Sequence, residues 1–467
     1  MARGGASEQA AKKTTFRDVF AVAEFRALWL AQLLSVAGDQ LARVALTVLV
    51  YDRTRSALLA AITFVVSIVP TFVGGVTLAW LADRYPRRRV MIVCDLVRAV
   101  LVLVMALPGV PIAAMVALLF VVVLAGAPFT SARAALYPDV LTGDRYLMGT
   151  AVTLTTLQFA QVIGFAAGGT IVGLFGIRAS LVVDAATFVA SALIVRAWVR
   201  ARPAPVTLTR AQTAEPSRSA GVMAGIRLVF ANRTLRTTML FGWLAAFYNA
   251  PEGVVTPLAR ALGGGAIAVG VILAAQALGE TAGAIVFSRF VPPPTRLRSM
   301  GPLAVAASAV LVLFIWRPDL PASLLILFAS GLFAAYQLAA NAAFVNAAPD
   351  EQRSQAFGLA QGGMSLGQGV VMVLAGAAAD HHSPALVIAL CGAVGAVTAL
   401  VIALGWVRDQ DRSSPAPSAR LGSSPRSRRA WCSPFCGGFG WSGGLAPGLA
   451  AHHALLPLST DMNALSD

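Results

Sequence analysis

The stretch GGVTLAWLADRYPRRRV, residues 74–90, joins two apolar runs through a short basic turn, and Asp83 stands where the first run ends. Four arginines follow within six residues, namely Arg84, Arg87, Arg88 and Arg89. Clusters of Lys and Arg in short loops mark the cytoplasmic side of a membrane protein. The stretch therefore predicts two membrane-spanning helices joined by a short cytoplasmic turn.

The composition of the rest of the chain agrees with a membrane protein. Of its 467 residues, 57% are hydrophobic and 12% are charged, and the mean hydropathy is +0.75. A bilayer core about 30 Å thick needs roughly 20 apolar residues per helix. We therefore predict an all-α integral membrane protein with twelve transmembrane helices. The predicted spans are 26–50, 56–82, 88–107, 112–135, 148–175, 178–200, 236–260, 264–289, 298–316, 321–346, 354–379 and 384–407.

The distribution of positive charge predicts the orientation. No apolar segment precedes the first full-length span, so no cleaved signal peptide is expected and both termini are placed in the cytoplasm. On this topology 29 of the 36 Lys and Arg residues are cytoplasmic. Five lie in external loops and two inside helices: Arg53, Arg55, Arg178, Arg260, Arg317, and Arg43, Arg98. The net charge of +15 is thus explained by topology and attraction to anionic lipid, and we expect no nucleic-acid partner.

A polar stretch divides the predicted spans six and six. We predict a cytoplasmic segment (1–25), a six-helix half (26–200), a cytoplasmic linker (201–235), a second six-helix half (236–407) and a disordered cytoplasmic tail (408–467). Apolar residues at helical spacing over 222–230 favour a short amphipathic helix, and an unstructured tether is an equal alternative. The tail holds Cys432, Cys436, His452 and His453, whose spacing fits no compact zinc module, so no metal is expected.

The basic turn also resembles the signature loop of the major facilitator superfamily of transporters, through Leu81, Ala82, Asp83, Arg84, Pro86, Arg87 and Arg88. Three further stretches resemble bacterial exporters related to macrolide-efflux proteins and the enterobactin exporter. They are residues 25–46, 132–176 and 353–380. The resemblance implies a bacterial inner-membrane transporter whose two halves repeat the same six-helix topology.

The resemblance also implies roles for particular residues. In the family the acid of the signature loop pairs with basic residues and meets a helix start of the other half, which holds the outward-facing state. Carried over, Asp83, Arg84, Arg87 and Arg88 would form a conformational gate. The corresponding loop of the second half, SRFVPPPTRLR (288–298), has no acid, so a one-sided gate is expected.

A glycine motif in the predicted fifth span bears on the direction of transport. Exporters of the superfamily often carry Gly, Pro, two residues, Gly, Gly there, and this chain keeps the glycines at Gly164, Gly168 and Gly169 but has Phe165 in place of proline. Glycines also allow helices to pack closely in lipid. The motif therefore supports proton antiport only in part, and helix packing explains the glycines equally well.

Ionisable residues inside predicted spans are candidates for proton or substrate sites, because a charge in hydrocarbon is costly. Asp39 lies about 20 Å along the first helix, and Arg43, one turn further, can pair with it. The alternative is a purely structural ion pair. Glu280 lies mid-span among small residues, and Glu252 lies in the proline-broken segment NAPEGVVTP, where a place at the external mouth is also compatible.

Three further charged residues are given structural interpretations. Asp95 and Arg98 are three residues apart in the predicted third span, and we interpret them as an intramembrane pair. Asp184 lies close to the external end of the sixth span, where we expect it to be partly solvated.

The favoured function is export of amphipathic small molecules, such as a drug, antibiotic or siderophore, by alternating access and proton antiport. Proton-coupled uptake and a transporter-like accessory protein without transport remain alternatives. No phosphate-binding loop and no nucleophile with a plausible base occur in the sequence, so we expect neither an enzyme nor a cofactor. The expected partners are the bilayer, a small molecule and protons, and the chain is expected to be monomeric.

Overall fold

The computed structural model describes residues 16–78, 80–203, 226–349 and 352–413. The amino-terminal residues 1–15, most of the predicted linker and the tail beyond 413 lie outside the described residues. Every described secondary-structure element is a helix. The N-terminal bundle consists of α1 (Phe16–Phe20), α2 (Ala23–Thr54), α3 (Ala57–Val66), α4 (Val69–Thr77), α5 (Leu81–Arg84), α6 (Arg87–Ala106), α7 (Ile112–Val140) and α8 (Asp144–Trp198).

The helices after the linker form the C-terminal bundle. Its first segment is broken into four short helices, where Pro251 and Pro257 remove backbone N–H donors. They are α10 (Arg233–Trp243), α11 (Ala245–Tyr248), α12 (Ala250–Gly253) and α13 (Val255–Ala261). The others are α14 (Ala266–Phe290), α15 (Pro293–Ala309), the 3₁₀ helix η1 (Val310–Trp316), α16 (Leu320–Phe333), α17 (Tyr336–Ala347), α18 (Arg353–Ala379) and α19 (Pro384–Ser413).

By length and composition, nine helical segments of the described chain are suited to cross a membrane. One of them, the 55-residue α8, carries two predicted spans, 148–175 and 178–200. Gly176 separates these two parts, because its φ of 82° and ψ of 172° interrupt the helix at a conformation that favours glycine. The predicted spans 88–107 and 236–260 coincide with α6 and with α10 to α13, which are not among the nine.

The structure describes helix at two of the predicted boundaries. Helix α19 continues to Ser413, past the predicted end of the last span at 407, because hydrophobicity marks where a span leaves lipid and a helix can continue into water. Residues 226–231 of the predicted linker are helical, which favours a helix over a tether there. Its Val229 is fully buried and packs with Met239 and Phe344 of the C-terminal bundle.

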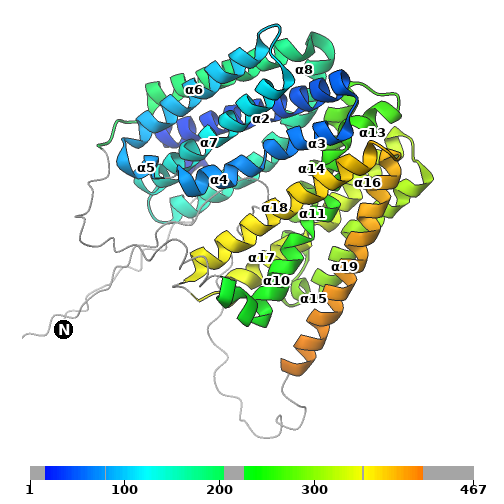
Figure 1. Cartoon of the computed structure of the whole chain (residues 1–467). Coiled ribbons are helices and arrows are strands. Elements are labelled where there is room, and N and C mark those ends of the chain that lie inside the picture. Colours follow the sequence, from blue (N-terminus) through cyan, green and yellow to red (C-terminus); the bar gives the residue numbers. More distant parts are fainter. Residues whose placement is uncertain (1–15, 79, 204–225, 350–351, 414–467) are drawn as a thin grey trace, which may run out of the picture.

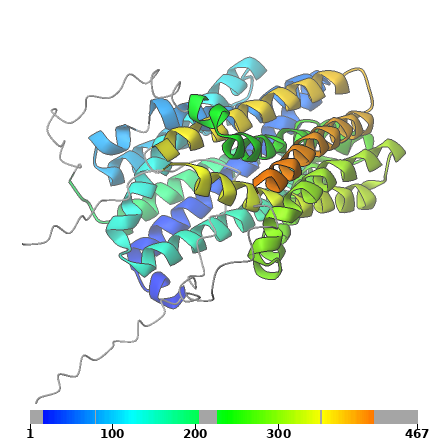
Figure 2. The same cartoon turned by 90° about the horizontal axis from the view of Figure 1, so that it is seen from below.

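The two bundles lie side by side, with the blue-to-cyan helices on one side and the green-to-orange helices on the other (Figure 1, Figure 2). Within the N-terminal bundle, α2 packs against α8, and α6 packs against α7 and α8. Within the C-terminal bundle, α14 packs against α16, and α15 packs against α19. Contacts of α8 with α14 and of α3 with α18 form the two seams between the bundles.

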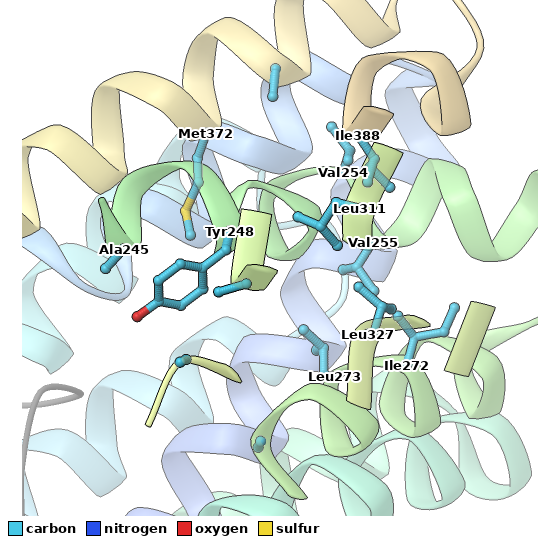
Figure 3. Packing of buried hydrophobic residues seen from close by; sticks show 14 of the residues in the cluster. Ala245, Tyr248, Val254, Val255, Ile272, Leu273, Leu311, Leu327, Met372 and Ile388 are labelled. Atoms are coloured by element: carbon cyan, nitrogen blue, oxygen red, sulfur yellow. The ribbon is translucent and has the colours of Figure 1, made fainter. Parts of the chain in front are cut away.

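The largest apolar cluster belongs mainly to the C-terminal bundle and reaches across the seams. Figure 3 shows part of this cluster, in which Val255 of α13, Ile272 of α14 and Leu327 of α16 lie next to one another. Phe64 and Phe165 of the N-terminal bundle belong to the same cluster, and both are buried. Apolar packing therefore continues from one bundle into the other.

The outer surface of the bundles is apolar. On α19 the exposed large side chains recur every three or four residues, which places them on one helix face. They are Leu386, Leu390, Val394, Val397, Leu400, Val401 and Leu404. A continuous apolar stripe of this kind would be unfavourable in water and is suited to contact with lipid tails.

Candidate functional site

One arginine and three carboxyl groups lie close together inside the N-terminal bundle. Arg98 on α6 donates a hydrogen bond to the Asp39 carboxylate on α2, and another to the Ser35 hydroxyl at 2.9 Å. Its guanidinium is 3.8 Å from the Asp95 carboxylate, one turn earlier on α6, and 4.0 Å from the centre of the Phe188 ring. Only 3% of the Arg98 side chain is exposed, so these contacts replace water around its charge.

Asp184 on α8 is the third carboxyl of this group, and the sequence-based expectation of partial solvation is wrong. The residue is 0% exposed, and within the described chain neither carboxylate oxygen has a hydrogen-bond partner. Asp39 and Arg98 are the charged groups that act on it. The expectation failed because closeness to a helix end along the chain does not report whether neighbouring helices cover the side chain.

Asp39 and Arg43 do not form the predicted pair. The structure pairs Asp39 with Arg98, whereas the Arg43 guanidinium donates to the backbone carbonyl of Ser67 at 3.4 Å. The two residues are one turn apart on α2 and each finds a partner on another helix. Helix packing brings Arg98 to Asp39, and the alternative i,i+4 pair would contribute only about 0.2–0.5 kcal/mol.

Arg43 faces the region between the bundles. Its guanidinium carbon lies 5.3 Å from the centre of the Phe64 ring and 5.9 Å from that of Phe165, within the range of cation–π attraction. Glu252 of α12 lies within electrostatic range of Arg43, and Glu280 of α14 lies within electrostatic range of Glu252. Charged groups from both bundles therefore act on one another here, with two aromatic rings beside Arg43.

A polar network supports this group from the C-terminal bundle. The Gln276 side chain donates to the Asn249 side chain at 2.7 Å and lies one helical turn before Glu280 on α14. The Gln337 amide donates to the Tyr248 hydroxyl at 3.0 Å. Asn249 lies at the break between α11 and α12, so the interrupted helix supplies side-chain partners at the site.

The signature loop binds within its own bundle. Arg87 forms an ion pair with Asp139 of α7 at 2.7 Å, and Arg88 donates to the backbone carbonyl of Arg196 on α8. Asp83 and Arg84 are exposed on α5, which packs against α6 and α7. A cavity of about 590 Å³ lies beside the loop, and Arg88, Arg89, Arg196 and Arg202 are among its lining residues.

At the opposite end, two sets of polar contacts join the bundles. Arg260 of α13 forms an ion pair with Asp52 of α2 at 2.7 Å. Asp380, after α18, accepts hydrogen bonds from the Ser56 hydroxyl at 2.9 Å and from the backbone N–H of Ala57 at the start of α3. These contacts, which we call the end latch, join the two bundles at that end.

The three predicted packing glycines lie in helix contacts. Gly164 and Gly168 face α2. A Cβ added at Gly168 would lie 3.4 Å from the Cα of Leu41, which is close to ordinary van der Waals contact. Gly169 faces α14, where an added Cβ would lie 2.7 Å from the Cα of Gly270. Gly169 and Gly270 therefore allow α8 and α14 to approach closely across the seam.

Sequence reasoning missed Asp184 and the end latch. Asp184 carried a usable signal, since it is an ionisable residue within an apolar span. The latch carried none, because Asp52 and Arg260 are 208 residues apart and each resembles an ordinary loop charge. Among the residues that the structure describes, no group of three or more His, Cys, Asp or Glu is arranged to hold a metal ion.

Comparison with known families identifies the class of protein. The family profile described as Major Facilitator Superfamily matches residues 28–255 and again 252–463. The chain belongs to the Major Facilitator Superfamily. The double match confirms the superfamily that the signature loop resembles. Members of this superfamily are multi-pass membrane transporters and not enzymes. A comparison with curated protein sequences gives no match.

Solved structures of major facilitator transporters share the fold. A POT family transporter in complex with 5-aminolevulinic acid has 10% identity and a TM-score of 0.67 over 85% of this chain and 98% of its own. A mutant of the nucleoside transporter NupG has 15% identity and a TM-score of 0.61 over 82% and 99%. A bacterial homologue of the human lysosomal transporter Spinster, inward-facing and unoccupied, has 16% identity and a TM-score of 0.63 over 86% and 100%.

Proposed function

We propose that this major facilitator transporter exports amphipathic small molecules by alternating access, driven by proton antiport. It would act as a monomer in a bacterial inner membrane, with twelve spans in two six-helix halves, 26–200 and 236–407, and both termini in the cytoplasm. The observation that carries the proposal is that Arg43 of the N-terminal bundle and Glu252 of the C-terminal bundle lie within electrostatic range of each other, as do Glu252 and Glu280.

The surroundings of these charges support an amphipathic substrate. Phe64 and Phe165 lie beside Arg43, and the Tyr248 hydroxyl lies in the network that reaches Glu280. Binding sites for small molecules combine apolar walls with a few fixed polar groups. An elongated apolar molecule with one charged or polar group could contact both the apolar walls and the polar groups. A drug, an antibiotic or a siderophore can have this chemistry.

The contacts between the bundles support alternating access. The end latch joins the bundles at one end, and at the other end Arg87 and Arg88 of the signature loop bind partners in their own bundle. We propose that this is the inward-facing conformation. In the outward-facing state the latch would open, and the gate residues Asp83, Arg84, Arg87 and Arg88 would engage the second half.

Carboxyl groups between the bundles support proton coupling. Glu252 and Glu280 interact electrostatically, so protonation of one lowers the cost of ionising the other. Alternating exposure of such a pair to the two sides of the membrane would exchange a proton for the substrate. Export then corresponds to antiport, and uptake would correspond to symport.

Transport into everted membrane vesicles tests this function. With the vesicle interior acidified, antiport predicts that vesicles containing the wild-type protein accumulate a cationic amphipathic dye, and that Glu280→Gln reduces this accumulation at least tenfold. Asp144→Asn, which changes an exposed acid in the first turn of α8, serves as the matched control.

The same preparation separates export from uptake. Accumulation in right-side-out vesicles with an acidic exterior, but not in acidified everted vesicles, would establish the uptake alternative. Wild-type transport at equal rates with and without a proton gradient would rule out proton coupling in either direction.

A further inference from the structure

The charge balance around Arg98 is uneven. Asp39 from α2, Asp95 from α6 and Asp184 from α8 share this one guanidinium, and together they carry more negative charge than it can neutralise. Charged groups in an apolar interior need a counter-charge or a proton. Arg43 also acts on Asp39, which is 34% exposed, so the buried Asp95 and Asp184 carboxyl groups are the ones left to share Arg98, and we expect one of them to bind a proton.

The contacts distinguish the three carboxyl groups. Asp39 accepts a hydrogen bond from Arg98, and Asp95 accepts one from the Ser191 hydroxyl at 2.6 Å. Asp184 has no hydrogen-bond partner on either carboxylate oxygen within the described chain, and the nearby Thr187 hydroxyl donates to the Asp184 backbone carbonyl instead. Asp184 is therefore the carboxyl group for which the neutral, protonated form is most favourable.

Exposure provides a path between the cluster and water. The Asp39 side chain is 34% exposed, whereas Asp184 is 0% exposed. The Asp39 carboxyl group is therefore accessible from outside the bundle in this conformation, whereas the Asp184 carboxyl group is not. Arg98 interacts with both carboxyl groups and can form an ion pair with only the one that is ionised.

Gly38 brings the Asp184 carboxyl group against α2. A Cβ at this position would collide with the Asp184 carboxylate oxygen and with the Thr187 hydroxyl. Gly38 directly precedes Asp39, so the absence of a side chain lets α8 place its acid beside the exposed one. The charged groups that face Asp184 are Asp39 from α2 and Arg98 from α6.

We propose that Asp184 is an occluded proton site of the N-terminal bundle, and that it exchanges its proton with Asp39 while Arg98 changes partner. The O–H bond at Asp184 breaks as an O–H bond forms at Asp39, and Arg98 moves from Asp39 to Asp184. The total charge of the cluster is unchanged, so the step needs no further counter-ion. A role for this step in transport rests on the proposed proton antiport, whereas the proton on Asp184 does not.

Infrared difference spectroscopy of the full chain in lipid nanodiscs at neutral pH tests the proton site. The wild-type spectrum minus that of Asp184→Asn is expected to contain a protonated-carboxyl C=O band, which shifts when aspartate is labelled with carbon-13. Wild type minus Asp144→Asn should lack this band. A folded Asp184→Asn variant with no difference band would overturn the proposal.

Two more variants keep the test decisive if Asp184→Asn does not fold. Asp184→Glu should retain the band but lose its response to labelled aspartate. Gly38→Ala should move the band frequency, because the carboxyl group is displaced from α2. An unchanged aspartate band in both variants would equally exclude Asp184 as its source.

Vesicle transport then separates this inference from the proposed function. Asp184→Asn is expected to lower the ratio of gradient-driven to gradient-free transport at least tenfold, whereas a merely structural defect would lower both rates and keep their ratio. If wild-type transport ignores the gradient but the band is lost in Asp184→Asn, antiport fails and the proton site stands. If transport is coupled and the band persists, the proton site fails alone.

Discussion

Arg260 holds Asp52 across the seam between the bundles through both carboxylate oxygens. The Nη2 atom of Arg260 lies 2.8 Å from Oδ1 and 2.7 Å from Oδ2 of Asp52, and its Nε lies 3.2 Å from Oδ1. Both side chains are about one-third exposed, so water weakens the attraction. The pair thus has the geometry of a specific contact and the strength of a reversible one.

Asp52→Asn should shift the chain towards separation of the bundles at the latch end. Exposed ion pairs contribute about 0.5 kcal/mol, which corresponds to a roughly twofold change in the ratio of closed to open states. Spin labels at Arg53→Cys and Ala261→Cys, with the native cysteines replaced, would report this as a larger long-distance population. An unchanged distribution would show that the pair does not bias the conformation.

Asp380→Asn should open the same end more strongly, because the Asp380 carboxylate caps α3 and joins the bundles at once. Asn keeps one acceptor oxygen but loses the charge and the second acceptor, and hydrogen bonds to a charged group contribute about 1.5–3 kcal/mol. Asp319→Asn is the matched control, since Asp319 caps α16 within its own bundle through the Ala322 N–H at 3.1 Å, and Asn caps a helix about as well as Asp. Asp319→Asn should change thermal stability little, and only Asp380→Asn should alter the spin-label distances. Equal effects of the two variants on those distances would contradict a latch role.

Gly169→Ala and Gly168→Ala should differ although they are neighbours. At Gly169 a Cβ would lie 2.7 Å from the Cα of Gly270 on α14, so the bundles must separate. At Gly168 the nearest atom is the Cα of Leu41 at 3.4 Å, which is ordinary contact. Overpacking costs about 1–3 kcal/mol. Thermal unfolding in detergent should show a clear loss for Gly169→Ala alone, and similar losses for both would argue against the close seam.

Arg98→Met should destabilise the N-terminal bundle by about 3–5 kcal/mol, because it leaves the Asp39 and Asp95 carboxylates without their cation. The double variant Arg98→Met with Asp39→Asn should recover part of this loss, since one uncompensated charge is removed. Chemical unfolding followed by circular dichroism measures both variants. Additive losses in the double variant would show that the two residues do not act as a pair.

Asp83→Asn should favour the inward-facing state if the signature loop is the gate that we propose. The substitution would remove the charge with which Asp83 binds the second half in the outward-facing state. In the present conformation Asp83 is exposed, so the substitution should change the energy of this state little. Spin labels at Arg145→Cys and Arg298→Cys should show a smaller short-distance population. Asp144→Asn, another exposed acid of the N-terminal bundle, is the control and should leave the distribution unchanged.

Several levels of organisation could be predicted from the sequence because they depend on local properties. Apolar run length predicts helices in lipid, and the loop around Asp83 carries the family resemblance that the profile match confirms. The break at Pro251 and Pro257 was also visible, since proline cannot donate the backbone hydrogen bond of a helix interior. These features need no knowledge of which helices become neighbours.

The pairing of charges was decided by the tertiary structure alone. Asp39 has Arg43 one turn away in sequence, but its partner is Arg98 on another helix, because interhelical packing sets which side chains meet in the interior. Asp184 stands near a predicted helix end, yet packing of α2 and α6 over α8 removes it from water. The sequence by itself determined a helical membrane transporter of the Major Facilitator Superfamily. The fold decided which of its acids are paired, exposed or occluded, because burial and distance arise only when separate helices pack together.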